Sequence, residues 1–173
     1  MNDVTHKPGK KDQHGAALLE FAVLLPLLVI LLFGMVEFGR ALLQANTLTK
    51  AVTTGARYLA RYPDLLSDSP HCNRDCTDCA DWNTAVAQAE ILIENDNAGA
   101  GSVILPGLDA GGAITFDRDR RLMSVSGNSY FICVIEVQAS TPFVSMSGGS
   151  LVPFFQVGPI NLIARAEERY LGE

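Results

Sequence analysis

The sequence is poor in the residues that many enzymes use for acid–base and nucleophilic chemistry. It has three histidines, two of them among the first 15 residues, and it has no lysine after Lys50. His71 is therefore the one histidine left in the remainder of the chain for general acid–base catalysis. No lysine remains there to form a Schiff base or to bind a phosphate. We expect no catalytic residues and no cofactor.

Positive charge is also scarce. Lysine and arginine number 13 against 19 aspartates and glutamates, which gives a net charge of −6. A chain of this charge has no general attraction for nucleic acid, so we expect no nucleic-acid partner. With 173 residues, the chain is long enough for one ordinary domain but short for a two-domain enzyme.

One long apolar run stands out against this background. The 21 residues from Ala16 to Val36 contain a single charge, Glu20. A helix of this length, at about 1.5 Å per residue, spans roughly 32 Å and matches the hydrocarbon core of a bilayer. No Ala-x-Ala cleavage site follows before Pro63. We therefore predict a retained transmembrane helix in contact with membrane lipid, and not a removable secretory signal.

After this run the apolar residues continue on one side of a helix. They recur at steps of three and four residues: Phe38, Leu42, Ala45, Leu48, Val52, Ala56 and Leu59. The pattern predicts that the helix leaves the membrane and continues to Tyr62, where Pro63 ends it. This stripe, and in particular Leu42, Ala45, Leu48, Val52 and Ala56, can pack against partner helices or against the chain's own distal part.

The distal sequence predicts an antiparallel sheet with one helix. The helix is expected over 83–94, with Asn83 as its cap. Alternating apolar residues predict strands at 114–116, 122–125, 130–141 and 160–168. The charged segment 118–121 is expected to form a hairpin. The predicted fold class is therefore α+β, in which a long N-terminal helix, first transmembrane and then amphipathic, precedes a small domain.

The chain divides into three predicted regions. Residues 1–15 form a polar cytoplasmic leader, residues 16–62 form the long helix, and residues 63–173 form an extracytoplasmic domain. This orientation is favoured because all four cysteines lie beyond the apolar run, where an oxidising compartment suits them.

Three of the four cysteines lie in one polar loop. Cys72, Cys76 and Cys79 have a spacing also found in the iron–sulfur loop of radical enzymes that use S-adenosylmethionine, but such enzymes need a large barrel around the cluster. A zinc site with His71 or Cys133 as the fourth ligand is a second alternative. Because their number is even and their compartment is expected to be oxidising, we predict two disulfides, with Cys133 bonded to one of the three. We expect no metal.

A carboxylate near the start of a membrane span is costly unless it is paired, so Glu20 is a candidate functional residue. Gly15 precedes it by five residues. Cleavage after Gly15 would make Ala16 a free amine, and the amine of a neighbouring subunit could then neutralise the carboxylate of Glu20.

The same residues resemble a known family. The segment Gly15-Ala-Ala-Leu-Leu-Glu-Phe21 is similar to the cleavage motif of type IV prepilins. The longer stretch through Leu-Pro-Leu27, Gly-Met-Val-Glu-Phe-Gly-Arg40 and Gly-Ala-Arg-Tyr58 closely resembles the TadE-like proteins of the tight-adherence (Flp) pilus. The related TadF-type subunits share the same start.

This resemblance implies a minor pilin-like protein that is needed for pilus assembly and has no enzymatic activity. It implies processing by a prepilin peptidase between Gly15 and Ala16, and contacts with other pilin-like subunits and the pilus assembly machinery. It also implies a single-pass protein of the bacterial inner membrane that can enter a surface pilus. Two alternatives stay open: a membrane-anchored metal or redox protein that uses the cysteine loop, and a permanently anchored adhesion or binding module.

Overall fold

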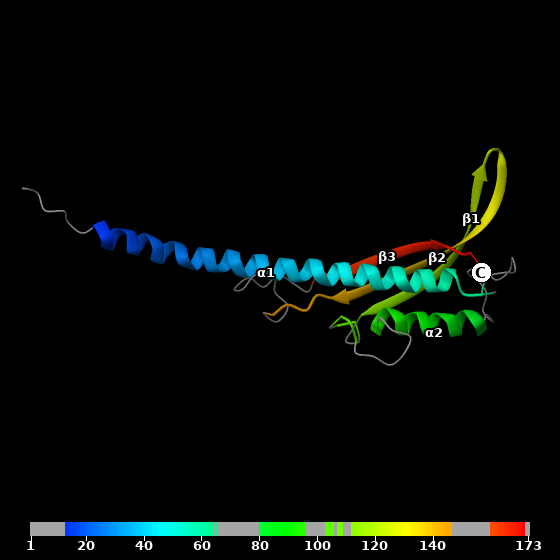
Figure 1. Ribbon diagram of the computed structural model, residues 1–173, viewed down its shortest axis with the longest axis horizontal. Coiled ribbons are helices and arrows are strands. Elements are labelled where there is room, and N and C mark those ends of the chain that lie inside the picture. Colours follow the sequence, from blue (N-terminus) through cyan, green and yellow to red (C-terminus); the bar gives the residue numbers. More distant parts are fainter. Residues whose placement is uncertain are drawn as a thin grey trace, which may run out of the picture.

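The computed structural model describes residues 13–63, 65, 80–95, 103–105, 107–108, 112–146 and 160–171. Its elements are, in chain order, α1 (Gln13–Ala60), α2 (Ala80–Asn95), β1 (Ala113–Val125), β2 (Asn128–Pro142) and β3 (Asn161–Arg169). The N-terminal half of α1 extends well beyond the other elements (Figure 1). The predicted α+β class with a long N-terminal helix is confirmed.

Helix α1 is continuous over 48 residues, which corresponds to a length of roughly 72 Å. Pro26 lies inside it without ending it. The helix ends at Ala60 with a tighter last turn, in which the amide of Tyr62 donates to the carbonyl of Leu59 at 3.3 Å. Pro63 then has no amide with which to continue the ladder. The predicted helix over 16–62 agrees with these bounds to within three residues at either end.

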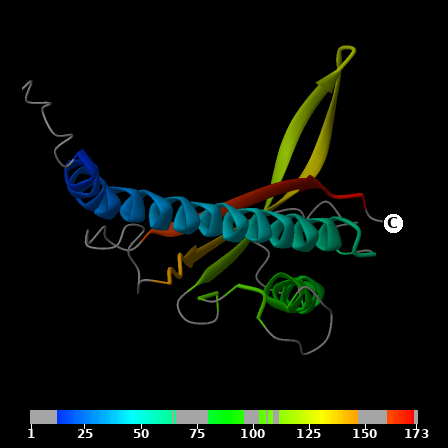
Figure 2. The same cartoon turned by 60° about the vertical axis from the view of Figure 1, so that its left-hand side comes forward.

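The three strands form one antiparallel sheet in the order β1-β2-β3. A two-residue turn joins β1 to β2, and both of its residues, Ser126 and Gly127, have positive φ angles of 52° and 84°. Such a turn matches the twist of a tight hairpin. Strand β1 pairs with β2 along its full length, whereas β3 pairs only with residues 134–142. The far part of the β1–β2 pair therefore projects from the sheet as a two-stranded hairpin (Figure 2).

The core lies between the second half of α1, helix α2 and the sheet. Helix α1 packs on β3 and β2, and α2 packs on α1. Gly55 sits at the crossing of the two helices, where an added Cβ would lie 2.6 Å from side-chain carbons of Ile93. The absence of a side chain at Gly55 lets the two helices approach closely. The buried members of this core include Leu48, Val52, Ala56, Leu59, Ala85, Ala89, Ile93, Ile135, Val137, Ala139 and Ala164.

Two local predictions are wrong. Helix α2 begins at Ala80, so Asn83 lies one turn inside the helix and is not its cap. Asp81 occupies the first turn, where a negative charge is favourable. The charged segment 118–121 does not form a hairpin by itself but lies in the middle of β1, paired with residues 132–135 of β2, and the turn of this hairpin lies at Ser126 and Gly127. Its charges are accommodated because they find partners on neighbouring elements, as described below.

Candidate functional site

The N-terminal half of α1 presents a continuous apolar surface. Between Leu18 and Val36 its large apolar side chains are exposed, apart from the half-buried Ile30, and none of its most apolar stretch is buried in the chain. A soluble protein rarely leaves so large an apolar patch uncovered. Among the described residues, α1 is the one helix long and apolar enough to cross a membrane. This surface suggests membrane anchoring.

Gly15 and Glu20 lie at the start of this surface. Gly15 is exposed in α1, and a Cβ added to it would meet no atom within 4 Å. Glu20 is also exposed, and within the part of the chain that the structure describes it has neither an ion pair nor a side-chain hydrogen bond. Ala16 lies between them in the same helix. The roles of these residues in cleavage and assembly stay predictions.

The amphipathic stripe divides into two parts. Leu48, Val52 and Ala56 are each 0% exposed and belong to the chain's own core. Leu42 is 50% exposed, and Ala45 is half-buried. Of the two environments expected for this stripe, the three buried residues therefore have the second, because they pack on the distal part of the same chain. The sheet of the same chain covers this face of α1.

Glu37 lies at the end of the apolar half, and no role was predicted for its side chain. Its side chain is only 4% exposed. One carboxylate oxygen accepts a hydrogen bond of 2.8 Å from the amide of Met146, and the other lies 3.9 Å from a guanidinium nitrogen of Arg40. Nearby, the side-chain amide of Gln44 donates to the carbonyl of Val144 at 3.2 Å. These contacts fasten the segment after β2 to α1, directly beyond the apolar run.

A signal for this junction was present in the sequence. Glu37 and Arg40 are opposite charges three residues apart on a helix, a spacing at which side chains meet. Their position directly after an apolar run indicates a boundary between lipid and water. The sequence carried no sign, however, that residues more than 100 positions away would complete the contact.

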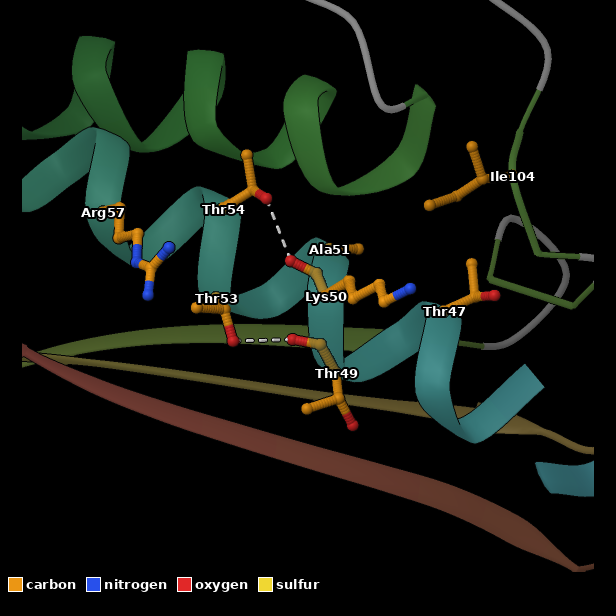
Figure 3. Close-up of a pocket in the computed structure, with 8 residues that line it drawn as sticks. All are labelled: Thr47, Thr49, Lys50, Ala51, Thr53, Thr54, Arg57 and Ile104. Atoms are coloured by element: carbon orange, nitrogen blue, oxygen red, sulfur yellow. Dashed lines mark hydrogen bonds between the residues drawn. The ribbon is translucent and has the colours of Figure 1, made fainter. Parts of the chain in front are cut away.

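A groove of about 470 Å³ lies along α1 and is bordered by Ile104 of the segment after α2 (Figure 3). Four threonine hydroxyls in it donate to helix carbonyls one turn earlier, at 2.7–2.9 Å. Arg57 donates to a carboxylate oxygen of Glu168 at 3.2 Å. The lining residues are Thr47, Thr49, Lys50, Ala51, Thr53, Thr54, Arg57 and Ile104. They include no carboxylate, histidine or cysteine, so the groove offers no acid–base pair for catalysis.

Arginines on β1 contact side chains of α2 and β3. The guanidinium of Arg118 lies 4.4 Å from the ring centroid of Trp82 in α2, and burial lowers the pKa of Arg118 from its ordinary value. Arg121 donates a 2.8 Å hydrogen bond to Glu167 of β3. This bond is the main reason that the pKa of Glu167 lies below its usual range. These contacts explain why a charged segment is stable within a strand.

The predicted cysteine cluster falls mostly outside the described residues, which include neither His71 nor Cys72, Cys76 and Cys79. Cys133 in β2 is disulfide-bonded. The connectivity of the predicted disulfides stays a prediction. Within the described parts of the chain, no group of three or more histidine, cysteine, aspartate or glutamate side chains is arranged to hold a metal ion.

Comparison with protein families adds one finding. The family model described as TadE-like protein matches residues 15–57. This segment is a TadE-like region. The match confirms the resemblance seen in the sequence and suggests a protein related to the tight-adherence pilus. No curated protein and no solved structure matches the chain.

The TadE-like region coincides with particular features of α1. It begins at Gly15, includes Glu20 and the Glu37–Arg40 pair, and ends at Arg57 within the part of α1 that packs on the sheet. The matched segment therefore contains the whole apolar surface and four of the core residues of α1, namely Leu48, Ala51, Val52 and Ala56. Helix α2 and the three strands lie outside it.

Proposed function

We propose that the chain is a minor pilin-like subunit required for assembly of a tight-adherence pilus, and that it acts as a structural protein without catalytic activity. The observation that carries this proposal is the TadE-like match on a helix whose N-terminal half is exposed and apolar. In this proposal the subunit sits in the bacterial inner membrane by a single span, with residues 63–173 outside the cytoplasm. A prepilin peptidase removes residues 1–15.

The apolar half of α1 serves two environments in turn. Before assembly, its side chains lie in the hydrocarbon core of the membrane, which a helix of this length can span. During assembly, the same side chains pack beside the helices of other pilin-like subunits, where close van der Waals packing replaces lipid contacts. No bond has to be made or broken for this exchange.

In this proposal Glu20 makes the contact between subunits selective for processed chains. A carboxylate in low-dielectric surroundings needs a cation, and within this chain's described residues Glu20 has none. Cleavage after Gly15 creates the amine of Ala16 on every processed subunit. An ion pair between this amine and Glu20 of a neighbour would favour processed subunits over unprocessed ones.

The sheet and α2 pack directly on the second half of α1. The buried side chains of Leu48, Val52 and Ala56 join the core, and Glu37 holds the segment after β2 at the membrane boundary. The position of α1 in an assembly therefore determines the position of the sheet.

The proposal is tested with variants expressed in a strain that lacks the chromosomal gene for this chain. Gly15→Ile should block removal of residues 1–15 and abolish pili, because a bulky residue obstructs the approach of the peptidase to the backbone. Gly9→Ile, a matched change within the leader, should leave both processing and pili intact. Mass spectrometry of membrane fractions and electron microscopy of cells give the two readouts.

Glu20 variants separate cleavage from assembly. Glu20→Gln should be cleaved at least in part but should fail to support pili, whereas Glu20→Asp, which keeps the charge, should retain a measurable fraction of them. Normal pili with Glu20→Gln would contradict the proposed ion pair. Piliation by a Gly15→Ile chain that keeps residues 1–15 would instead favour a permanently anchored adhesion or binding module.

The cysteine loop offers the remaining rival, a membrane-anchored metal or redox protein. Since Cys133 is disulfide-bonded, it is not available as a thiolate ligand in this state. Zinc or iron bound stoichiometrically to the purified protein, measured by elemental analysis, would favour the rival.

A further inference from the structure

The projecting end of the β1–β2 pair, residues 119–133, is named here the distal hairpin. On one of its faces Leu122 and Phe131 are paired across the strands, and they are 62% and 61% exposed. The guanidinium of Arg120 lies 3.8 Å from the ring centroid of Phe131. On the other face Met123 is paired with Tyr130, and both are exposed.

No described element covers this apolar surface. Strand β3 ends its pairing at Val134, so the edge of β2 beyond that residue has no neighbouring strand. An isolated two-stranded hairpin is marginally stable in water. Exposed aromatic side chains and an open strand edge are together typical of a surface that another chain covers.

The position of the distal hairpin excludes the chain's own membrane as the partner. The backbone amide of Tyr170 donates to the carbonyl of Cys133, and the amide of Leu171 donates to the carbonyl of Ala60, both at 2.9 Å. These two bonds place the base of the hairpin level with the end of α1. The apolar run ends at Val36, 24 residues earlier, which is roughly 36 Å along the helix. The hairpin also projects to the side of α1 and not back along it (Figures 1 and 2).

A complementary surface lies on the opposite side of the same molecule. Helix α2 and the distal hairpin lie on opposite sides of α1 in both views (Figures 1 and 2). Helix α2 carries three carboxylates and no lysine or arginine. Its outer face presents residues at helical spacing, namely Asn83, Ala87, Glu90 and Glu94. Glu90 and Glu94 have no ion pair among the described residues.

We propose that the distal hairpin of one copy docks onto the outer face of α2 of the next copy. Leu122 and Phe131 then cover the small side chain of Ala87, and Arg120 lies against Glu90 and Glu94. Because the two surfaces differ and lie on opposite sides of α1, the contact joins parallel copies head to tail. Such heterologous contacts repeat from copy to copy and form rows or rings.

This contact needs parallel, membrane-anchored copies but neither cleavage after Gly15 nor a pilus. The two proposals can therefore fail separately. The contact is tested with the full chain in membranes, using a photoreactive amino acid in place of Leu122 and, as a matched control, in place of Ile163. Ile163 is 66% exposed on β3, outside the distal hairpin.

Illumination should yield a crosslinked dimer from position 122, with residues 80–95 in the partner peptide on mass spectrometry. Position 163 should yield no such dimer. Crosslinking of position 122 to a second hairpin, to a different protein or to lipid would overturn the proposal, as would the absence of any product. Processing after Gly15 is measured in the same fractions. Cleaved chains without the crosslink would refute this contact and leave the proposed function standing.

Charge reversal gives a second, independent readout. Arg120→Glu and Glu90→Arg should each lower the crosslink yield by about two- to fivefold, which is typical of an exposed ion pair. The double variant should restore the yield, whereas Lys50→Glu, in the groove along α1, should leave it unchanged. Both reversed side chains are exposed, so the fold should persist. Equal losses in the single and double variants would refute the proposed pairing.

Discussion

Truncation of Leu48 to alanine is expected to destabilise the distal domain far more than the same truncation of Leu42. The two leucines lie on one apolar stripe of α1 and look alike in the sequence. In the structure Leu48 is 0% exposed, between α1 and the sheet, whereas Leu42 is 50% exposed. The comparison therefore separates the part of the stripe that packs on the chain itself from the part left uncovered.

The expected magnitudes differ several-fold. Leucine-to-alanine changes in a packed core cost about 2–5 kcal/mol, because the transfer free energy is lost and a cavity remains. A loss of about 3 kcal/mol lowers the Tm by roughly 12 °C, at about 4 °C per kcal/mol for a domain of this size. At an exposed position the cost is about 0.5 kcal/mol or less, which corresponds to about 2 °C.

The assay is thermal unfolding of the full chain in detergent micelles. Near-ultraviolet circular dichroism is the suitable signal, because it reports Trp82 and the tyrosines of the distal domain and not the helical content of α1. A large shift with Leu48→Ala and a small shift with Leu42→Ala would agree with the structure. Similar shifts for the two variants would refute the division of the stripe.

Substitutions at four further positions are tested by the same unfolding assay. Gly55→Ala should cost about 1–3 kcal/mol, since its Cβ would meet side-chain carbons of α2 at 2.6 Å. Gly39→Ala, which meets nothing within 4 Å, should stabilise the helix by up to about 1 kcal/mol. Glu37→Ala should lower stability by about 1–3 kcal/mol because the amide of Met146 loses its acceptor, and Glu37→Gln should lose less. Cys133→Ser should cost about 2–4 kcal/mol without reductant, and a reductant should destabilise the wild type more than it destabilises this variant.

The course of α1 was predictable because its signals are local. The length of the apolar run, the later three- and four-residue spacing and Pro63 together determine where the helix runs and stops. What covers each face was not predictable, because Leu42 and Leu48 satisfy the same helical pattern whether lipid, another subunit or the chain's own sheet lies opposite. Only the tertiary arrangement distinguishes these environments.

The strand boundaries were also not predictable from local sequence patterns. Segment 118–121 consists of charged residues, which are typical of surface turns. It nevertheless lies within β1, because Arg118 contacts Trp82 of α2 and Arg121 contacts Glu167 of β3. Those partners lie tens of residues away, so no local pattern reveals them. The contact between Glu37 and Met146 was hidden for the same reason, since it joins residues 109 positions apart.

The most direct test of the account is the intact mass of the wild-type chain from membranes of cells with an active prepilin peptidase. The proposed function predicts a processed chain that begins at Ala16 and lacks residues 1–15. A chain that keeps residues 1–15 under these conditions would contradict the assignment as a pilin-like subunit, whatever the outcome of the other experiments.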